Sequence, residues 1–391
     1  MSSSLIYKTQ TVNGTFEGHK KACYESRTVS GTCEDNTKFV YKNKTLNGTC
    51  GDNKKTEALN GEQIYATQLR KVEPYLAWNK KVTGTTTEKF KKIIEQNYNV
   101  KLDSYWDLHK WSIDNCESFW AEIWNYFKVI ASKDYEQVLV KTGPGFLDNK
   151  WFAGASLNYA ENLLRIRDDR IALACLDEEG NFEEITYAQL FEEVKLYAAA
   201  FRKNGLRKGD TVCCMINNRK EAVIGCLAAA SIGAIWTGIQ AFYGAKSAAK
   251  IVNRLGPKFF LVCDGFEIEN LDCRIIDKVP TIIENTPSIK KVIVVPTREE
   301  TLSKGISHIR NSCYLSEFLE SGKQPDGSVP DLIFEQLPFD HPLFIICTSG
   351  TTGLPKAPVH GAGTFLPLLI DVAFHWNLKP GDTLFNFVPV K

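Results

Sequence analysis

The chain has 391 residues, a length that suggests two or three domains. Its 47 lysine and arginine residues nearly balance its 46 aspartate and glutamate residues, so the net charge is only +1. This balance excludes a chain built mainly to bind nucleic acid or an anionic membrane surface. The sequence has no long apolar run and begins without an apolar segment, so we expect no membrane span, no secretory signal and a cytoplasmic location.

Twelve cysteines are scattered along the chain, and no Cys-x-x-Cys pattern occurs. Most of them, such as Cys226 and Cys347, lie inside apolar runs. We interpret them as reduced thiols that pack as small apolar side chains. No spacing of cysteine and histidine fits a metal site, so we expect none.

Residues 1–64 are rich in Gly, Ser, Thr and Asn and carry a short repeat. Thr11–Thr15, Thr28–Thr32 and Thr45–Thr49 share the pattern Thr-x-x-Gly-Thr at a spacing of 17 residues. Each copy has too few apolar side chains to offset the entropy cost of ordering it. We predict a disordered, low-complexity tail, for which a linker or a repeat expansion is favoured over a binding module.

Residues 65–164 are rich in aromatic side chains, and we predict a helical region. Apolar residues between positions 90 and 98 recur at helical spacing, and Asp114 and Glu117 have the spacing of a capping box before a second aromatic helix. A cluster of tryptophans could form a binding face or a packing seam, and we favour the seam because aromatic residues four positions apart usually pack inward. The cluster consists of Trp106, Trp111, Trp120 and Trp124.

Strands and helices alternate in residues 165–391. Thr186 and Gln189 form a capping box for a helix that ends at Gly205. Short, evenly apolar strands between helices indicate the α/β class, with a parallel sheet covered on both faces. Ligands bind at the carboxyl ends of such strands, so we expect the site in the loops that follow them. The predicted strands are 171–175, 211–216, 234–237, 259–263, 291–295 and 343–346, and further predicted helices are 221–232 and 246–255.

One of these loops has the composition of an anion-binding site. Glycines let backbone N–H groups approach an anion closely, hydroxyl groups add donors, and a lysine adds positive charge. The spacing differs from that of a Walker A loop. We nevertheless predict a phosphate-binding loop, and a plain polar surface turn is the less favoured interpretation. The residues that would bind phosphate are Thr348, Ser349, Gly350, Thr351, Thr352, Gly353 and Lys356.

Two histidines lie near this loop. His360 is four residues beyond Lys356, and packing is its favoured role, with a contact to substrate as the alternative. His341 precedes the strand 343–346, and we predict that its role is structural.

The segment Ile345–Lys356 resembles the signature of the adenylate-forming, AMP-binding superfamily of acyl-CoA synthetases. Tyr105–Trp120 and Trp151–Leu164 are similar to the N-terminal region shared by acetyl- and acetoacetyl-CoA synthetases. Leu227–Trp236 resembles an early motif of the same group, and Phe334–Phe344 looks specifically like the acetoacetyl-CoA synthetases. The resemblance implies an acetyl-CoA synthetase-like helical region and a partial AMP-binding domain after the tail.

The resemblance also implies a two-step reaction. The carboxylate of acetoacetate attacks the α-phosphate of Mg·ATP to give acyl-AMP and diphosphate, and CoA then displaces AMP. In that family the loop holds the β- and γ-phosphates, so residues 348–353 and Lys356 inherit this role. Such a ligase acts on small molecules in lipid metabolism and ketone-body utilisation, with ATP, Mg²⁺ and CoA as cosubstrates.

The sequence departs from the family pattern in two places. The loop Thr237–Tyr243 differs from the usual one, and the segments that bind adenine, ribose and Mg²⁺ in the family have no counterpart before Lys391. We therefore expect the N-terminal part of such an enzyme, with no complete set of catalytic residues. Two alternatives remain: a truncated, non-catalytic nucleotide-binding or interaction protein, and an acetyl- or other short-chain acyl-CoA synthetase.

Overall fold

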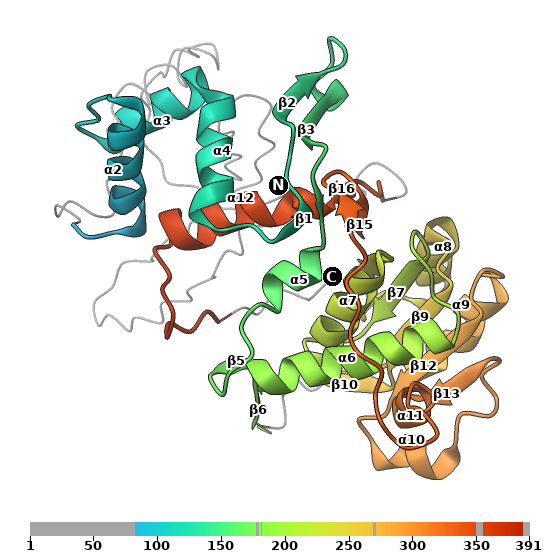
Figure 1. The fold of residues 1–391 in the computed structure, drawn as a ribbon. Coiled ribbons are helices and arrows are strands. Elements are labelled where there is room, and N and C mark those ends of the chain that lie inside the picture. Colours follow the sequence, from blue (N-terminus) through green and yellow to red (C-terminus); the bar gives the residue numbers. More distant parts are fainter. Residues whose placement is uncertain (1–82, 177–179, 181, 269–270, 349–354, 386–391) are drawn as a thin grey trace, which may run out of the picture. The chain divides into compact units, whose positions relative to one another are not determined.

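A seven-stranded sheet organises the larger part of the protein (Figure 1). The structure, a computed structural model, describes residues 83–176, 180, 182–268, 271–348 and 355–385, so the predicted tail 1–64 lies outside the described residues. The strand order is β13-β12-β9-β7-β8-β15-β16, and all neighbours are parallel except β15 and β16. This architecture confirms the predicted α/β class. The strands are β7 (Thr211–Met215), β8 (Ile235–Gly238), β9 (Phe259–Cys263), β12 (Lys291–Val295), β13 (Ser312–Tyr314), β15 (Pro342–Ile345) and β16 (Val359–Gly361).

Helices cover both faces of this sheet because the connections change direction at β8. The crossover through α7 leads from β7 to β8 on one side, and the crossover through α8 returns past β7 to β9 on the other side. Right-handed crossovers in opposite directions place their helices on opposite faces. Accordingly α6 packs on α7 and α11, whereas α8 packs on α9. These helices are α6 (Tyr187–Lys203), α7 (Lys220–Ile232), α8 (Ala245–Leu255), α9 (Val279–Glu284) and α11 (Leu315–Glu320).

The start and end of α6 confirm the sequence prediction. The Gln189 backbone N–H donates to the Thr186 hydroxyl (3.1 Å), and the Thr186 N–H donates to the Gln189 side chain (2.8 Å). After the helix, Gly205 has a φ of +92°, which a residue with a Cβ rarely adopts. The helix buries the apolar face that its sequence pattern predicts.

A second hydrophobic core joins the first helices to the last one. Phe90 on α2 and Trp124 on α4 belong to the same core as Phe365 and Phe374. The Thr86 N–H donates to the Asn377 side chain (3.0 Å), and the Thr87 hydroxyl donates to the Phe374 carbonyl (2.8 Å). Figure 1 shows α12 beside the helices of the N-terminal part. The elements are α2 (Thr86–Tyr98), α3 (Tyr105–Asp114), α4 (Cys116–Tyr126), α12 (Phe365–Ile370) and the turn η4 (Asp371–His375).

The packing-seam interpretation holds for part of the tryptophan cluster. Trp111 and Trp124 are buried and Trp120 is half-buried, whereas Trp106 is 71 % exposed. The predicted capping box of Asp114 and Glu117 is wrong. Asp114 is the last residue of α3, whose own capping box is formed by Ser104 and Asp107. Asp114 pairs instead with Lys110 one turn earlier.

The described residues also form four small antiparallel sheets that were not predicted. Residues 131–157 contribute strands to a region expected to be helical, because these strands lack the continuously apolar and buried pattern of the main-sheet strands. The predicted strand 171–175 forms, but it pairs with β6 in a hairpin outside the main sheet. The small sheets contain β1 (Ala131–Lys133), β2 (Gln137–Lys141), β3 (Asn149–Ala153), β4 (Ser156–Leu157), β5 (Ile171–Leu176), β6 (Phe182–Thr186), β10 (Gly265–Ile268), β11 (Leu271–Arg274) and β14 (Leu337–Pro338).

Several short elements complete the described fold. None of the described helices has the length and apolar character needed to cross a bilayer. The described cysteines form no disulfide with one another. Burial raises the pKa of Cys214 and of Cys263 to about 12, in keeping with thiols that pack as apolar groups. The short elements are α5 (Tyr159–Leu163), α10 (Glu299–Lys304), η1 (Phe146–Asp148), η2 (Ile276–Lys278) and η3 (Ala362–Thr364).

Candidate functional site

The predicted phosphate loop connects the two strands of a β-hairpin. Phe344 on β15 faces His360 on β16, and Ile345 faces Val359. At the base of the loop, the Thr348 N–H donates to the Lys356 carbonyl (2.9 Å), and the Lys356 N–H donates to the Thr348 hydroxyl (3.1 Å). The hairpin therefore fixes both ends of the loop.

The central residues of the predicted loop lie outside the described residues. Their role in binding phosphate stays a prediction, as does that of Thr348 and Lys356, whose side chains lie at the loop base. These central residues are Ser349, Gly350, Thr351, Thr352 and Gly353.

The two predicted histidines have different surroundings. The ring Nε2 of His341 lies 2.9 Å from the Gly233 carbonyl oxygen, and so links the start of β15 to the end of α7. This contact agrees with the predicted structural role. His360 is half-buried on β16, and a contact between its ring and substrate stays a prediction.

The loop of the hairpin begins at the carboxyl edge of the sheet. β15 runs parallel to β8, and the buried Thr237 hydroxyl on β8 donates to the Ile345 carbonyl (2.7 Å). The carboxyl ends of parallel strands lie at one edge, so the loop base is at the same edge as the loops after β7, β9 and β12.

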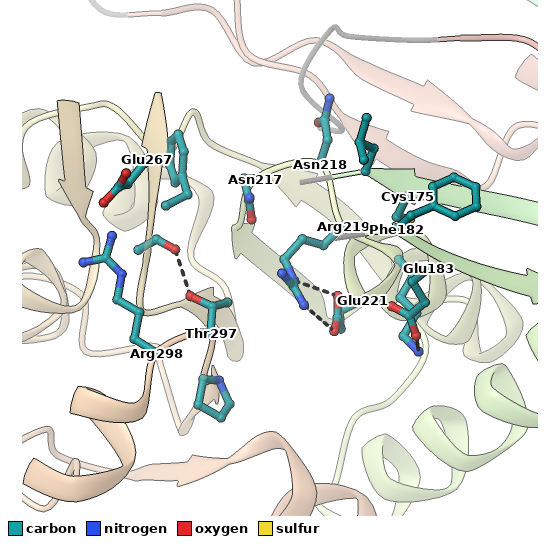
Figure 2. A pocket seen from close by; sticks show the side chains of 15 residues that line it. Cys175, Phe182, Glu183, Asn217, Asn218, Arg219, Glu221, Glu267, Thr297 and Arg298 are labelled. Atoms are coloured by element: carbon teal, nitrogen blue, oxygen red, sulfur yellow. Dashed lines mark hydrogen bonds and ion pairs between the residues drawn. The ribbon is translucent and has the colours of Figure 1, made fainter. Parts of the chain in front are cut away.

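A cavity of about 360 Å³ opens at that edge. The connection after β7 runs to β8 on one side, and the connection after β9 runs to β12 on the other side. β7 and β9 therefore flank a topological switch point, where open α/β sheets bind ligands. Figure 2 shows residues that follow three different strands around this cavity. They are Asn217, Asn218 and Arg219 after β7, Glu267 on β10 after β9, and Thr297 and Arg298 after β12.

Charged side chains line one wall of this cavity. The Arg219 guanidinium lies 3.2 Å from the Glu221 carboxylate, which is almost fully buried. Burial opposes the charge of Arg219, but the adjacent Glu221 carboxylate raises its pKa. Lys220 bridges Glu183 and Glu193, and burial raises the pKa of Glu193. The wall therefore carries charges of both signs, already paired with one another.

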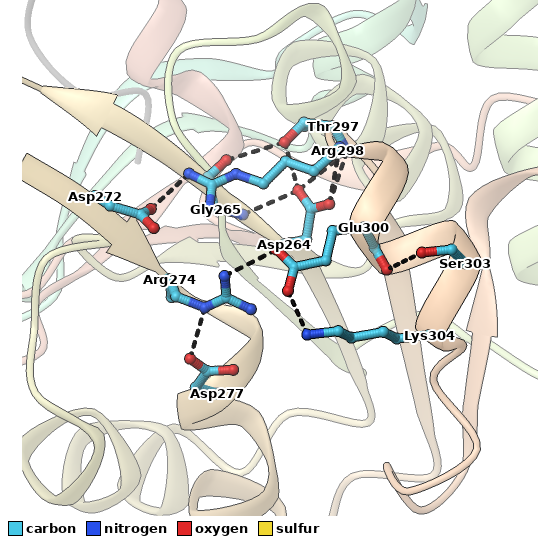
Figure 3. Close-up of polar contacts among 10 residues, drawn as sticks. All are labelled: Asp264, Gly265, Asp272, Arg274, Asp277, Thr297, Arg298, Glu300, Ser303 and Lys304. Atoms are coloured by element: carbon cyan, nitrogen blue, oxygen red, sulfur yellow. Dashed lines mark hydrogen bonds and ion pairs between the residues drawn. The ribbon is translucent and has the colours of Figure 1, made fainter.

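Asp264 holds the opposite wall together (Figure 3). Its side chain follows β9 and is 1 % exposed. The carboxylate accepts hydrogen bonds from the N–H groups of Gly265 (2.9 Å), Thr297 (3.0 Å) and Arg298 (3.0 Å) and from the Thr297 hydroxyl. These contacts satisfy the buried charge and fix the loop after β12 against β10. The Arg298 guanidinium is then held by Asp272 (2.6 Å).

Asp264→Asn is expected to lower the free energy of unfolding by about 2 kcal/mol, because an amide NH₂ would replace one acceptor oxygen in front of N–H donors. Urea denaturation followed by circular dichroism measures the change. Asp272→Asn is the control, and its loss is expected to stay below about 1 kcal/mol because that pair is partly exposed. Equal losses in the two variants would show that the burial of Asp264 has no special role.

The sequence analysis did not identify the polar residues around this cavity, although it expected the site in the loops that follow the strands. Asn217, which lines the cavity, lies two residues after β7, and Asp264, which supports the opposite wall, directly follows β9. That position is the signal that could have identified them. Within the described part of the chain, no group of His, Cys, Asp or Glu side chains is arranged to hold a metal ion.

Comparison with known proteins identifies the family of the chain. The family described as "AMP-binding enzyme" matches residues 161–391, more than half of the chain. The chain belongs to the AMP-binding enzyme family. The family "Acetyl-coenzyme A synthetase N-terminus" matches residues 105–163.

Individual relatives are similar to the chain over about three quarters of its length. Acetoacetyl-CoA synthetase of Danio rerio is 36% identical over 308 residues, which cover 78% of this chain and 46% of the relative. The corresponding protein of Macaca fascicularis is 38% identical over 306 residues, covering 77% and 45%. The solved structure of acetoacetyl-CoA synthetase from Streptomyces lividans matches with a TM-score of 0.67 and 31% identity, covering 76% of this chain and 44% of that one. The chain thus spans slightly less than half the length of these relatives.

Proposed function

We propose that this chain supplies the ATP phosphate-binding part of an acetoacetate–CoA ligase that works through acyl-AMP. The observation that carries the proposal is the hairpin-anchored loop at the carboxyl edge of an AMP-binding family sheet. The acetoacetyl-CoA synthetase relatives support acetoacetate as the acid. A cytoplasmic location and the division into residues 1–64, 65–164 and 165–391 remain part of the proposal.

The chemistry required of this part is electrostatic. During adenylation the substrate carboxylate is the nucleophile and diphosphate leaves, so negative charge builds on phosphate oxygens. N–H groups, hydroxyls and the Lys356 ammonium would stabilise that charge without taking part in a covalent step. Mg²⁺ would accompany ATP as Mg·ATP in the proposed reaction.

Exchange of labelled diphosphate into ATP tests the proposed reaction. The protein expressed from the transcript that encodes this chain is assayed with acetoacetate, acetate and butyrate. We expect exchange that depends on the acid and is fastest with acetoacetate. Faster exchange with acetate would favour the acetyl-CoA synthetase alternative, and no exchange with any of the three acids would contradict the ligase proposal.

Lys356→Met is expected to weaken binding of Mg·ATP by about tenfold, because one ammonium near the β- and γ-phosphates is lost. Binding of AMP, which lacks those phosphates, should not change. Isothermal titration calorimetry measures both affinities. Lys379→Met, which removes an exposed lysine from a later turn, is the control. An equal loss of ATP and AMP affinity in Lys356→Met would contradict the assignment.

A second candidate is a nucleotide-binding protein that does not form acyl-AMP. It is favoured by the loop Thr237–Tyr243, whose sequence differs from the usual one of the family. Mass spectrometry after incubation of the 391-residue chain with Mg·ATP and acetoacetate separates the two candidates. Acyl-AMP formed by this chain alone contradicts the second candidate.

A further inference from the structure

One contact from outside the hairpin reaches the base of the phosphate loop. The Nη1 of Arg254, in the last turn of α8, donates to the Pro355 carbonyl at 2.9 Å. Pro355 is the residue directly before Lys356. No motif in the sequence points to this contact, because the two residues are 101 positions apart.

The hairpin itself leaves this carbonyl without a ladder partner among the described residues. Among the described residues, the last backbone hydrogen bond of the hairpin on the loop side joins Thr348 and Lys356. The guanidinium of Arg254, on helix α8, holds the backbone at Pro355, one residue further into the loop than Lys356.

The helix and both arms of the hairpin are packed closely together. Ile251 and Leu255 on α8 line a void of about 10 Å³ with Cys347 on the first arm and Ala357 on the second. A void of this size holds at most one water molecule. The Arg254 contact thus joins two elements that already touch, so its geometry is constrained by packing.

Among the described residues, Arg254 has no acidic partner for its charge. Lys246, Lys250 and Arg254 follow one another at four-residue spacing and so share one face of α8. None of the three forms an ion pair with another described residue. Arg254 is therefore both a hydrogen-bond donor to the loop base and a positive charge beside it.

We infer that Arg254 is a positioning residue for Lys356. By holding the Pro355 carbonyl, it fixes the backbone from which the Lys356 side chain extends toward the β- and γ-phosphates of ATP. The inference rests on the proposed function for its ligand. The hydrogen bond sets where Lys356 stands before nucleotide binds, which lowers the cost of ordering the loop base on binding.

Two variants of α8 separate the hydrogen bond from the charge. Arg254→Met removes both. Lys250 lies on the same face of α8 and lines the same void, so Lys250→Met removes one positive charge there without breaking the hydrogen bond to the loop. Arg254→Lys keeps a donor and the charge. Hydrogen–deuterium exchange of the Thr348 and Lys356 amides measures the loop base, and calorimetric titration measures Mg·ATP and AMP binding by the full 391-residue chain.

We expect Arg254→Met to speed exchange of the two amides and to weaken Mg·ATP binding about fivefold, with AMP binding unchanged. Lys250→Met should leave exchange unchanged, and Arg254→Lys should recover part of the ATP affinity. Unchanged exchange in Arg254→Met, or equal ATP losses in Arg254→Met and Lys250→Met, would overturn the inference. If the wild-type chain fails to bind Mg·ATP, the proposed function fails, whereas the exchange result tests the contact by itself.

Discussion

Asn158→Ala is expected to lower the free energy of unfolding by about 4 kcal/mol, because it removes a helix cap and leaves several buried polar groups unpaired. The side chain is fully buried. Its Nδ2 donates to the carbonyl oxygens of Ala230 (3.0 Å) and Glu335 (2.8 Å), and its Oδ1 accepts from the N–H groups of Ala160 (2.9 Å) and Glu161 (3.2 Å). One amide thus ties the start of α5, the end of α7 and the segment before β14 together.

Urea denaturation of the full chain measures this loss. Asn285→Ala is the matched control, since the Asn285 amide is exposed and donates to a single carbonyl, that of Thr281. Its loss should be below about 1 kcal/mol. Similar losses in both variants would mean that water replaces the partners of Asn158 and that the site is not as closed as the structure shows.

Gly322→Ala is expected to cost about 3 kcal/mol, because the added methyl group has no space. A Cβ at Gly322 would lie 2.5 Å from the Ala200 backbone nitrogen and 2.8 Å from its Cα. Ala200 is inside α6, where the backbone is held by the hydrogen bonds of the helix. The clash is relieved only if the turn after α11 moves away from α6.

Gly244→Ala is the control for this substitution. Gly244 has a φ of −64°, and no atom lies within 4 Å of a Cβ built there. As it precedes α8 as a cap, a loss of at most about 1 kcal/mol is expected. Thermal unfolding compares the variants, and a Gly322→Ala protein as stable as Gly244→Ala would refute the close approach of the turn to α6.

The main sheet could be predicted because its strands carry the signal by themselves. Thr211–Met215, Phe259–Cys263 and Lys291–Val295 are almost continuously apolar and buried, as strands covered on both faces must be. The capping box of Thr186 and Gln189 is equally local. By contrast, the β5–β6 pairing and the end of α3 at Asp114 depend on neighbours that a local pattern does not contain.

The candidate site likewise has one part that the sequence predicts and another part that only the fold reveals. The composition of residues 348–356 marks the phosphate loop, and the hairpin explains how its ends are held. Arg254 and Asp264 act through contacts with residues 101 and 33 positions away. Nothing in their immediate sequence reveals those partners, so only the fold identifies them.

The contact between Thr86 and Asn377 has a consequence for synthesis of the protein. The two residues are 291 positions apart, yet they join the first described helix to the segment after the last one. At roughly 5–20 residues per second, a ribosome needs on the order of 15–60 seconds to pass from one to the other. Throughout that interval Phe90 lacks the Phe374 ring that packs against it, at 4.9 Å between centroids. The first described helices are therefore among the last elements to complete their core. A growing chain exposes their aromatic side chains while the main sheet already has its strands.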